Sequence, residues 1–168
     1  MKTKRAIVAK VFGAALMMLL LAPVALMAQE KMSITTSSAE AKKLFIEGRD
    51  QVEILHYPQS IQSLKKAIEK DPHFAMAYLY LAQAQGNGAN PDDETLKKAV
   101  LYSDKVSPGE KHLIHYVKNM AEGNEEGILK HMQAMKELHP KDERVLTWSG
   151  YYYYSIDDQE KAMTYFRK

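Results

Sequence analysis

Residues 67–79 read AIEKDPHFAMAYL, and this stretch decides the fold class. Apolar side chains recur three or four positions apart on both sides of Pro72, which is the spacing of amphipathic helices rather than of strands. Proline has no amide hydrogen and restricts the residue before it, so Asp71-Pro72 ends one helix and turns the chain toward the next. The stretch therefore predicts a helix–turn–helix corner.

The same corner recurs along the chain with a period of about 34 residues. Two series of equivalent positions mark the first helix of each pair: Gly48, Ala82, Tyr116, Gly150 and Leu44, Tyr78, His112, Leu146. A third series marks the second helix and closes on a proline: Ser60, Leu64, Ala67, Pro72; Leu96, Val100, Ser103, Pro108; Ile128, Met132, Met135, Pro140. One pair cannot bury its apolar face alone, so the pattern predicts stacked helix pairs.

The period and these residue sizes resemble the tetratricopeptide repeat (TPR), a helix–turn–helix unit of 34 residues. Leu44 and Gly48 supply its bulky and tiny positions, which let the paired helix approach closely. The resemblance covers about residues 41–168 and is weakest in the third copy, where Tyr116 stands in the tiny position. It implies an all-α, right-handed TPR solenoid of antiparallel helix pairs. About three and a half repeats are expected, at about residues 41–74, 75–108, 109–142 and 143–168, the last truncated.

Residues 1–28 have the composition of a secretory signal peptide. Four basic residues fall within the first ten, and an apolar run from Val11 ends in small residues at Ala28. Cleavage after Ala28 is favoured by Pro23 within the run, and the alternative is an uncleaved membrane anchor. Either reading predicts export, to the periplasm or the medium. Residues 29–40 then form a polar, extended lead-in, where Ser37 and Glu40 predict a capping box that opens the first helix.

The composition excludes several classes of function. The 168 residues include no cysteine, which removes thiol catalysis, disulfides and thiolate metal sites. The net charge of +2 comes from the leader, since four of the 23 basic residues lie there and 19 remain against 21 acidic residues. No clustered basic excess is left, so we expect no nucleic-acid partner.

Polar clusters that could carry chemistry fit structural roles better. His112 and His115 are three apart on one helix and could share a metal only if Glu110 or His131 approached them. The acidic runs 92–94 and 157–160 each precede a helix, where carboxylates cap free amides. Residues 86–88 lack the remaining residues of a phosphate loop. We therefore expect no enzymatic activity, no cofactor and no metal.

The resemblance also implies a concave groove lined by the first helix of each pair. Its candidate residues are Lys42, Phe45, Arg49, Leu79, Gln83, Val117, Met120, Arg144, Tyr151 and Tyr154. They describe an apolar trough with cations at both ends, which suits an extended or helical peptide with apolar anchors and some acidic character. We expect a non-catalytic protein- or peptide-binding scaffold of the bacterial cell envelope.

Two alternatives stay open. The chain stops about 11 residues into a predicted helix, which leaves a ridge of Met163 and Phe166 uncapped, so the protein could be an assembly subunit that associates with itself through the C-terminal repeat. It could also carry a small ligand or metal at His112 and His115.

Overall fold

The computed structural model describes residues 31–88 and 90–167, and in these residues the only regular structure is helical. The elements are α2 (Ala39–Glu53), α3 (Tyr57–Lys70), α4 (Ala75–Gln85), α5 (Asp93–Tyr102), the 3₁₀ helix η1 (Ser103–Lys105), α6 (Pro108–Glu122), α7 (Glu125–Leu138), α8 (Glu143–Ser155) and α9 (Gln159–Phe166). The predicted all-α class is confirmed for this part of the chain. The predicted signal peptide lies outside it. None of the described helices has the length and apolarity that crossing a bilayer requires.

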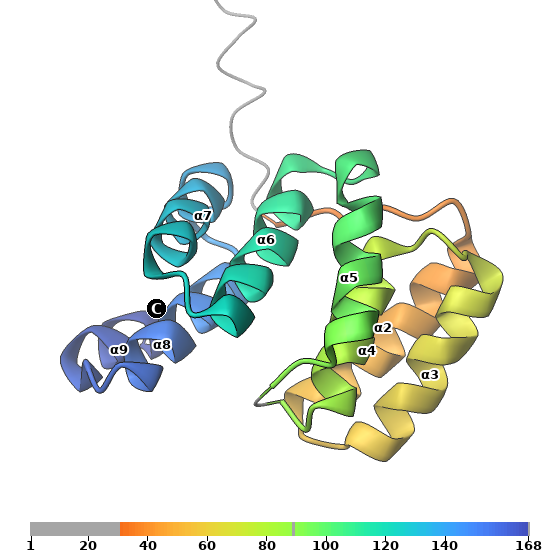
Figure 1. Ribbon diagram of the computed structural model, residues 1–168, viewed down its shortest axis with the longest axis horizontal. Helices are drawn as coiled ribbons and strands as arrows, with labels where there is room; N and C mark the ends of the chain where they lie inside the picture. The colour runs from red at the N-terminus through yellow and green to blue at the C-terminus, as the bar shows by residue number, and fades with distance from the viewer. Residues whose placement is uncertain (1–30, 89, 168) are drawn as a thin grey trace, which may run out of the picture.

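The helices pack as four consecutive pairs, α2 with α3, α4 with α5, α6 with α7 and α8 with α9. Figure 1 shows the pairs following one another from α2 and α3 at one end to α8 and α9 at the other. The first helices α2, α4 and α6 also contact in sequence, which makes α4 the most buried helix of the fold. Nine of its eleven residues are buried, so it forms the centre of the core.

Two of the positions predicted to need a very small residue, Gly48 and Gly150, lie at close contacts between paired helices. A Cβ atom on Gly48 of α2 would lie 2.6 Å from Cγ of Leu64 on α3, well inside contact distance. A Cβ on Gly150 of α8 would lie 2.4 Å from the Phe166 ring of α9. In the first and last pairs, glycine is therefore needed because the partner side chain occupies the space of a Cβ.

In the third pair the equivalent position is occupied by a large residue, Tyr116, and the helices pack differently. Tyr116, which stands in the tiny position, is only 1% exposed, and its hydroxyl donates to the Trp148 carbonyl of α8 at 2.9 Å. The close approach moves to Gly127 of α7, where a Cβ would lie 2.0 Å from Oδ1 of Asn119 on α6. The Tyr116 side chain thus contacts α8 of the fourth pair, whereas the glycines at the equivalent positions contact the second helix of their own pair.

Helix starts follow the capping rules, with one correction. The predicted capping box at Ser37 and Glu40 is wrong, because α2 begins one residue later with Ser38 as its N-cap, accepting from the Ala41 amide at 3.1 Å. A complete capping box forms instead at Ser107 and Glu110 of α6. The two acidic runs do cap helices, through Asp92 before α5 and Asp158 before α9.

A candidate binding site between α2 and α8

The lead-in, described from Lys31 to Ser38, lies across the turns that join the helix pairs. In Figure 1 it is the orange segment that runs from beside α6 to the start of α2. Its amides donate to one carboxylate at each turn: Met32 to Asp142, Thr35 to Glu110 at 2.7 Å, and Ser37 to Asp71 at 2.9 Å. The lead-in therefore contacts, in this order, the turns that precede the fourth, third and second pairs before the first pair begins.

Two of these carboxylates, Asp71 and Asp142, have pKa values lowered by the hydrogen bonds that they accept. Burial alone would raise the pKa of Asp71, but hydrogen bonds from Thr36 and Ser37 outweigh it and lower the pKa below its ordinary value. Burial likewise opposes the ionised form of Asp142, and the Arg144 side chain with the Met32 amide lowers its pKa overall. Hydrogen bonds donated to a carboxylate stabilise its charged form and so lower its pKa.

Arg144 and Asp142 form a tight pair at the start of α8. Asp142 is 1% exposed and is the N-cap of the helix. Nε and Nη2 of Arg144 donate to its two oxygens at 3.2 and 2.9 Å, and Nη2 also donates to the Met32 carbonyl at 2.9 Å. The pair thus holds both backbone polar groups of Met32, with the amide on Asp142 and the carbonyl on Arg144.

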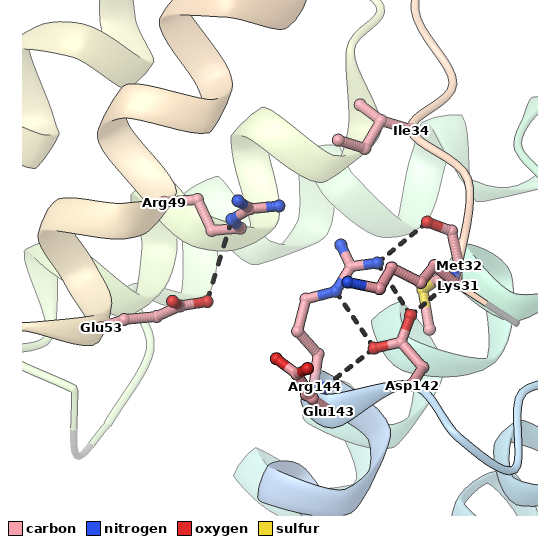
Figure 2. Close-up of a pocket in the computed structure, with 8 residues that line it drawn as sticks. All are labelled: Lys31, Met32, Ile34, Arg49, Glu53, Asp142, Glu143 and Arg144. Carbon is pink, nitrogen blue, oxygen red and sulfur yellow. Dashed lines mark hydrogen bonds and ion pairs between the residues drawn. The ribbon is translucent and has the colours of Figure 1, made fainter.

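A pocket of about 330 Å³ lies between this pair and α2. Figure 2 shows the lead-in and α8 forming one wall, with Arg49 and Glu53 of α2 facing them. The pocket is lined by Lys31, Met32, Ile34, Arg49, Glu53, Asp142, Glu143 and Arg144. Its volume is at the lower end of small-ligand pockets, about 300–1,000 Å³.

The α2 wall carries a second Arg–carboxylate pair. Nε and Nη2 of Arg49 donate to Asp50 at 3.0 and 2.7 Å, and Nε lies 3.8 Å from a Glu53 oxygen. Burial is the largest influence on Glu53 and raises its pKa, against the lowering effect of the Arg49 charge. Tyr80 is fully buried near both walls, and this burial raises its pKa to about 12.

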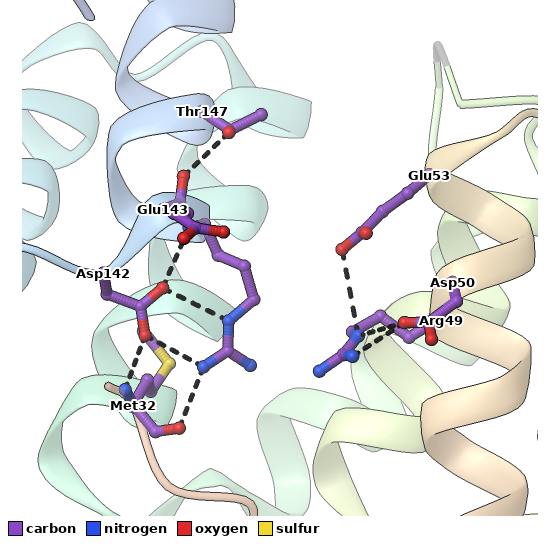
Figure 3. A network of polar contacts seen from close by, with 8 residues as sticks. Met32, Arg49, Asp50, Glu53, Asp142, Glu143 and Thr147 are labelled. Carbon is purple, nitrogen blue, oxygen red and sulfur yellow. Dashed lines mark hydrogen bonds and ion pairs between the residues drawn. The ribbon is translucent and has the colours of Figure 1, made fainter. Parts of the chain in front are cut away.

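Opposite charges balance across the pocket. The lining includes three cationic side chains, Lys31, Arg49 and Arg144, and three carboxylates, Glu53, Asp142 and Glu143. Figure 3 shows the two networks on opposite sides of an open space. The site is therefore rich in both donors and acceptors but has no net charge with which to attract an ion.

Four of the predicted groove residues are closed off by packing. Phe45 and Leu79 are fully buried, Val117 is 2% exposed and Gln83 is 7% exposed. Phe45 contacts Phe74 and Tyr80, with ring centroids 4.9 and 5.4 Å away. The prediction of an open apolar trough is corrected accordingly, because the side chains meant to line it form the core between α2, α4 and α6.

The other six candidates keep some surface. Lys42, Tyr151 and Tyr154 are exposed, the two tyrosines by 57% and 67%, and Met120 is half-buried. The arginines stand not at the two ends of a trough but in one pocket. Since Tyr151 follows Arg144 by seven positions, two helical turns, it lies on the same face of α8. Arg49, Arg144 and the two tyrosines therefore offer the pocket and the α8 face that leads away from it, whereas Lys42 on α2 and Met120 on α6 line neither.

Sequence reasoning predicted an extended lead-in but missed its contacts and the acidic residues of the pocket. Asp142 has the sequence context of an ordinary helix cap, and Glu53, whose side chain is 52% exposed, has that of any residue at a helix end. A signal was present in the hydroxyl-rich segment Ser33-Ile34-Thr35-Thr36-Ser37, whose polar side chains suit contact with carboxylates. Only the fold shows which carboxylates it meets.

The histidines form a separate cluster between α6 and α7. Nδ1 of His112 lies 2.9 Å from Nδ1 of His131, and the His115 ring stacks on His131 at a centroid distance of 5.4 Å. Burial is the largest cause that lowers the pKa of each of the three, to about 4 for His131. In the described residues, no group of three or more histidine or carboxylate side chains has a geometry that could hold a metal ion.

Comparison with known proteins adds no relative. The chain matches no protein-family model, and a search of curated proteins finds no significant match. Functional inference for this protein therefore rests on its residues and their arrangement.

Proposed function

We propose that the protein is a non-catalytic protein- or peptide-binding scaffold of the bacterial cell envelope, built as a TPR solenoid and binding on the face that carries the α2–α8 pocket. One observation carries the proposal: Arg49 and Arg144, two candidates from helices at opposite ends of the domain, line the same pocket. A pocket with convergent polar groups is the usual location of a ligand.

The solenoid interpretation is supported by the packing of the helix pairs. Gly48 and Gly150 occupy equivalent positions one hundred and two residues apart, and each is pressed against a side chain of its own partner helix. Recurrence of the same contact at three times the period is expected of stacked repeats.

The chemistry of the exposed surface also favours binding. Tyr151 and Tyr154 offer large side chains that end in a hydroxyl and lose little conformational entropy when they are covered, which makes tyrosine common at interfaces. They extend the pocket along α8, so a bound segment would contact polar groups at one end and aromatic area at the other.

The test is partner capture in the periplasm by cross-linking. Arg49→Glu combined with Tyr151→Ala should abolish capture while the circular dichroism spectrum stays helical. The control is Lys65→Glu, an exposed charge reversal on the outer helix α3, which should capture normally. Equal capture by all three proteins would move the binding surface to the outer side and refute the proposal.

Self-association through the last pair is the second candidate. Met163 and Phe166 are 46% and 44% exposed, and Phe166 packs edge-on against the exposed Tyr151 ring at 5.6 Å. An assembly subunit would bury these side chains against another copy. Sedimentation that changes with concentration, and no longer changes in Phe166→Ser, would favour this function.

A further inference from the structure

The capture of Met32 shows how an Arg–carboxylate pair acts on this surface. Asp142 accepts the Met32 amide and Arg144 donates to the Met32 carbonyl, while the two side chains bond each other at 2.9 Å. A carboxylate supplies an acceptor and a guanidinium supplies donors, so together they match the donor and acceptor that every peptide unit carries. These bonds involve only the main chain of the residue that is held.

The opposite wall also carries an arginine and a glutamate, which form an ion pair at 3.8 Å and hold no main chain among the described residues. Arg49 and Glu53 are one helical turn apart on α2, and both line the pocket. Asp50 engages Nε and Nη2 of Arg49, and none of the described residues bonds its Nη1. Within the described part of the chain, Arg49 is also the only ionic contact of Glu53, at 3.8 Å. Figure 2 shows both side chains directed toward the space in front of the lead-in.

The balance of charge argues for a neutral ligand group. Because Arg144 is paired with Asp142, and Arg49 with Asp50 and Glu53, an ionic side chain entering the pocket would have to compete with charges that are already paired. A peptide unit has no net charge and uses one donor and one acceptor, which this wall offers side by side.

We propose that Arg49 and Glu53 bind the main chain of an extended peptide that lies in the pocket alongside the lead-in, so that the ligand is recognised through its backbone amides. The inference rests on the proposed peptide-binding function and adds the binding mode. The peptide lies between the lead-in and α2, and its continuation passes along the α8 face toward Tyr151.

The test uses the full chain and a labelled probe with the sequence of residues 31–38, acetylated and amidated, because this is the extended segment that the structure shows on the surface. Fluorescence anisotropy measures its affinity. Arg49→Ala with Glu53→Gln should weaken binding about tenfold or more, as expected for loss of charge-assisted hydrogen bonds. The matched control is Lys43→Ala, an exposed substitution on α2 outside the pocket, which should leave the affinity unchanged.

Singly N-methylated versions of the probe separate backbone recognition from side-chain recognition. Methylation removes one amide donor and leaves the side chains intact, so at least one version should lose about tenfold in affinity against the wild-type protein. That loss should vanish in the Arg49→Ala, Glu53→Gln protein, since the partner of the amide is then gone.

Three results would overturn the inference. Binding that is equal for all methylated probes, or lost only when the probe's lysine is replaced, shows side-chain recognition. Binding that is lost in Asp142→Asn but kept in the α2 double variant shows that the probe merely replaces the lead-in. Absence of binding at about 1 mM probe excludes a useful affinity. Each leaves the capture experiment above as the independent test of the proposed function.

Discussion

Acidification should destabilise the protein through the histidine cluster, and His131 is the residue to test. Its Nδ1 faces Nδ1 of His112 at 2.9 Å, so one proton can be shared between the rings but two protons would repel. The His115 ring also stacks on the His131 ring. The surrounding charges are mostly positive, from Lys111, Lys118 and Lys130 against Asp104. A second proton is therefore unfavourable in the folded state.

The direction of the effect follows from the depressed pKa. Burial, then the neighbouring histidines, lower the pKa of His131 to about 4 from the model-compound value of 6.5. Between these two values the unfolded chain binds more protons than the folded chain. The contribution to the free energy of unfolding is thus fully present above about pH 6.5, and it is lost as the pH falls toward about 4.

The magnitude can be bounded from the same numbers. A pKa difference of about 2.5 corresponds to about 3.4 kcal/mol at most, at about 1.36 kcal/mol per unit. His131 is only half-buried, so solvent screens the interaction and we expect about 1–2 kcal/mol. This is a large share of the stability of a single domain, about 5–15 kcal/mol.

Urea unfolding followed by circular dichroism measures this loss at about pH 7 and about pH 4.5. His131→Gln removes the titrating ring, so the variant should lose about 1–2 kcal/mol less than the wild type over this interval. His56→Gln is the control, because His56 is exposed at the turn between α2 and α3. Carboxylates that also lose charge in acid affect all three proteins alike. Equal losses in wild type and His131→Gln would refute the reasoning.

Three further substitutions test the packing and the lead-in. Gly48→Ala should cost about 1–3 kcal/mol in urea unfolding, because its Cβ would lie 2.6 Å from Leu64 Cγ, and an unchanged midpoint would contradict the close approach. Ala67→Glu should unfold the first pair by burying an unpaired charge at a fully buried site, seen as lost amide protection in α2 and α3; retained protection would disprove this. Glu110→Gln should weaken the hold on the lead-in and cost about 1–3 kcal/mol, with faster hydrogen exchange at Thr35 than in the wild type. Exchange at Thr35 that stays slow would show that Glu110 does not anchor the lead-in.

The sequence was sufficient to predict the helices and their pairing. Proline at positions 72 and 108 and glycine at positions 48 and 150 have strong local consequences, since a missing amide hydrogen or a missing Cβ acts within one turn or one helix contact. In the structure Pro72 lies in the turn between α3 and α4, Pro108 begins α6 instead of ending the helix before it, and Gly48 and Gly150 lie at close contacts. The sequence marked Tyr116 as a large residue at a position that is small elsewhere, but the close contact at Gly127 depends on Asn119 of the neighbouring helix.

The site was only partly predictable, for a related reason. The resemblance to the TPR implied a groove face that carries Arg49 and Arg144, but it could not tell which residues on that face remain open. Phe45, Leu79 and Val117 have the correct spacing for a groove and are nevertheless covered by neighbouring helices. How much of a helix face stays open depends on how closely successive pairs stack, and small differences in side-chain size along the whole array determine that.

The order of apolar, small and helix-breaking residues therefore determined an all-helical chain of paired helices, because each of those signals acts over a few residues. The tertiary structure alone decided that residues 31–38 bind across three turns and that α2 and α8 share a pocket. Those contacts join residues up to 112 positions apart, and they exist only once the stacked pairs have brought the residues together.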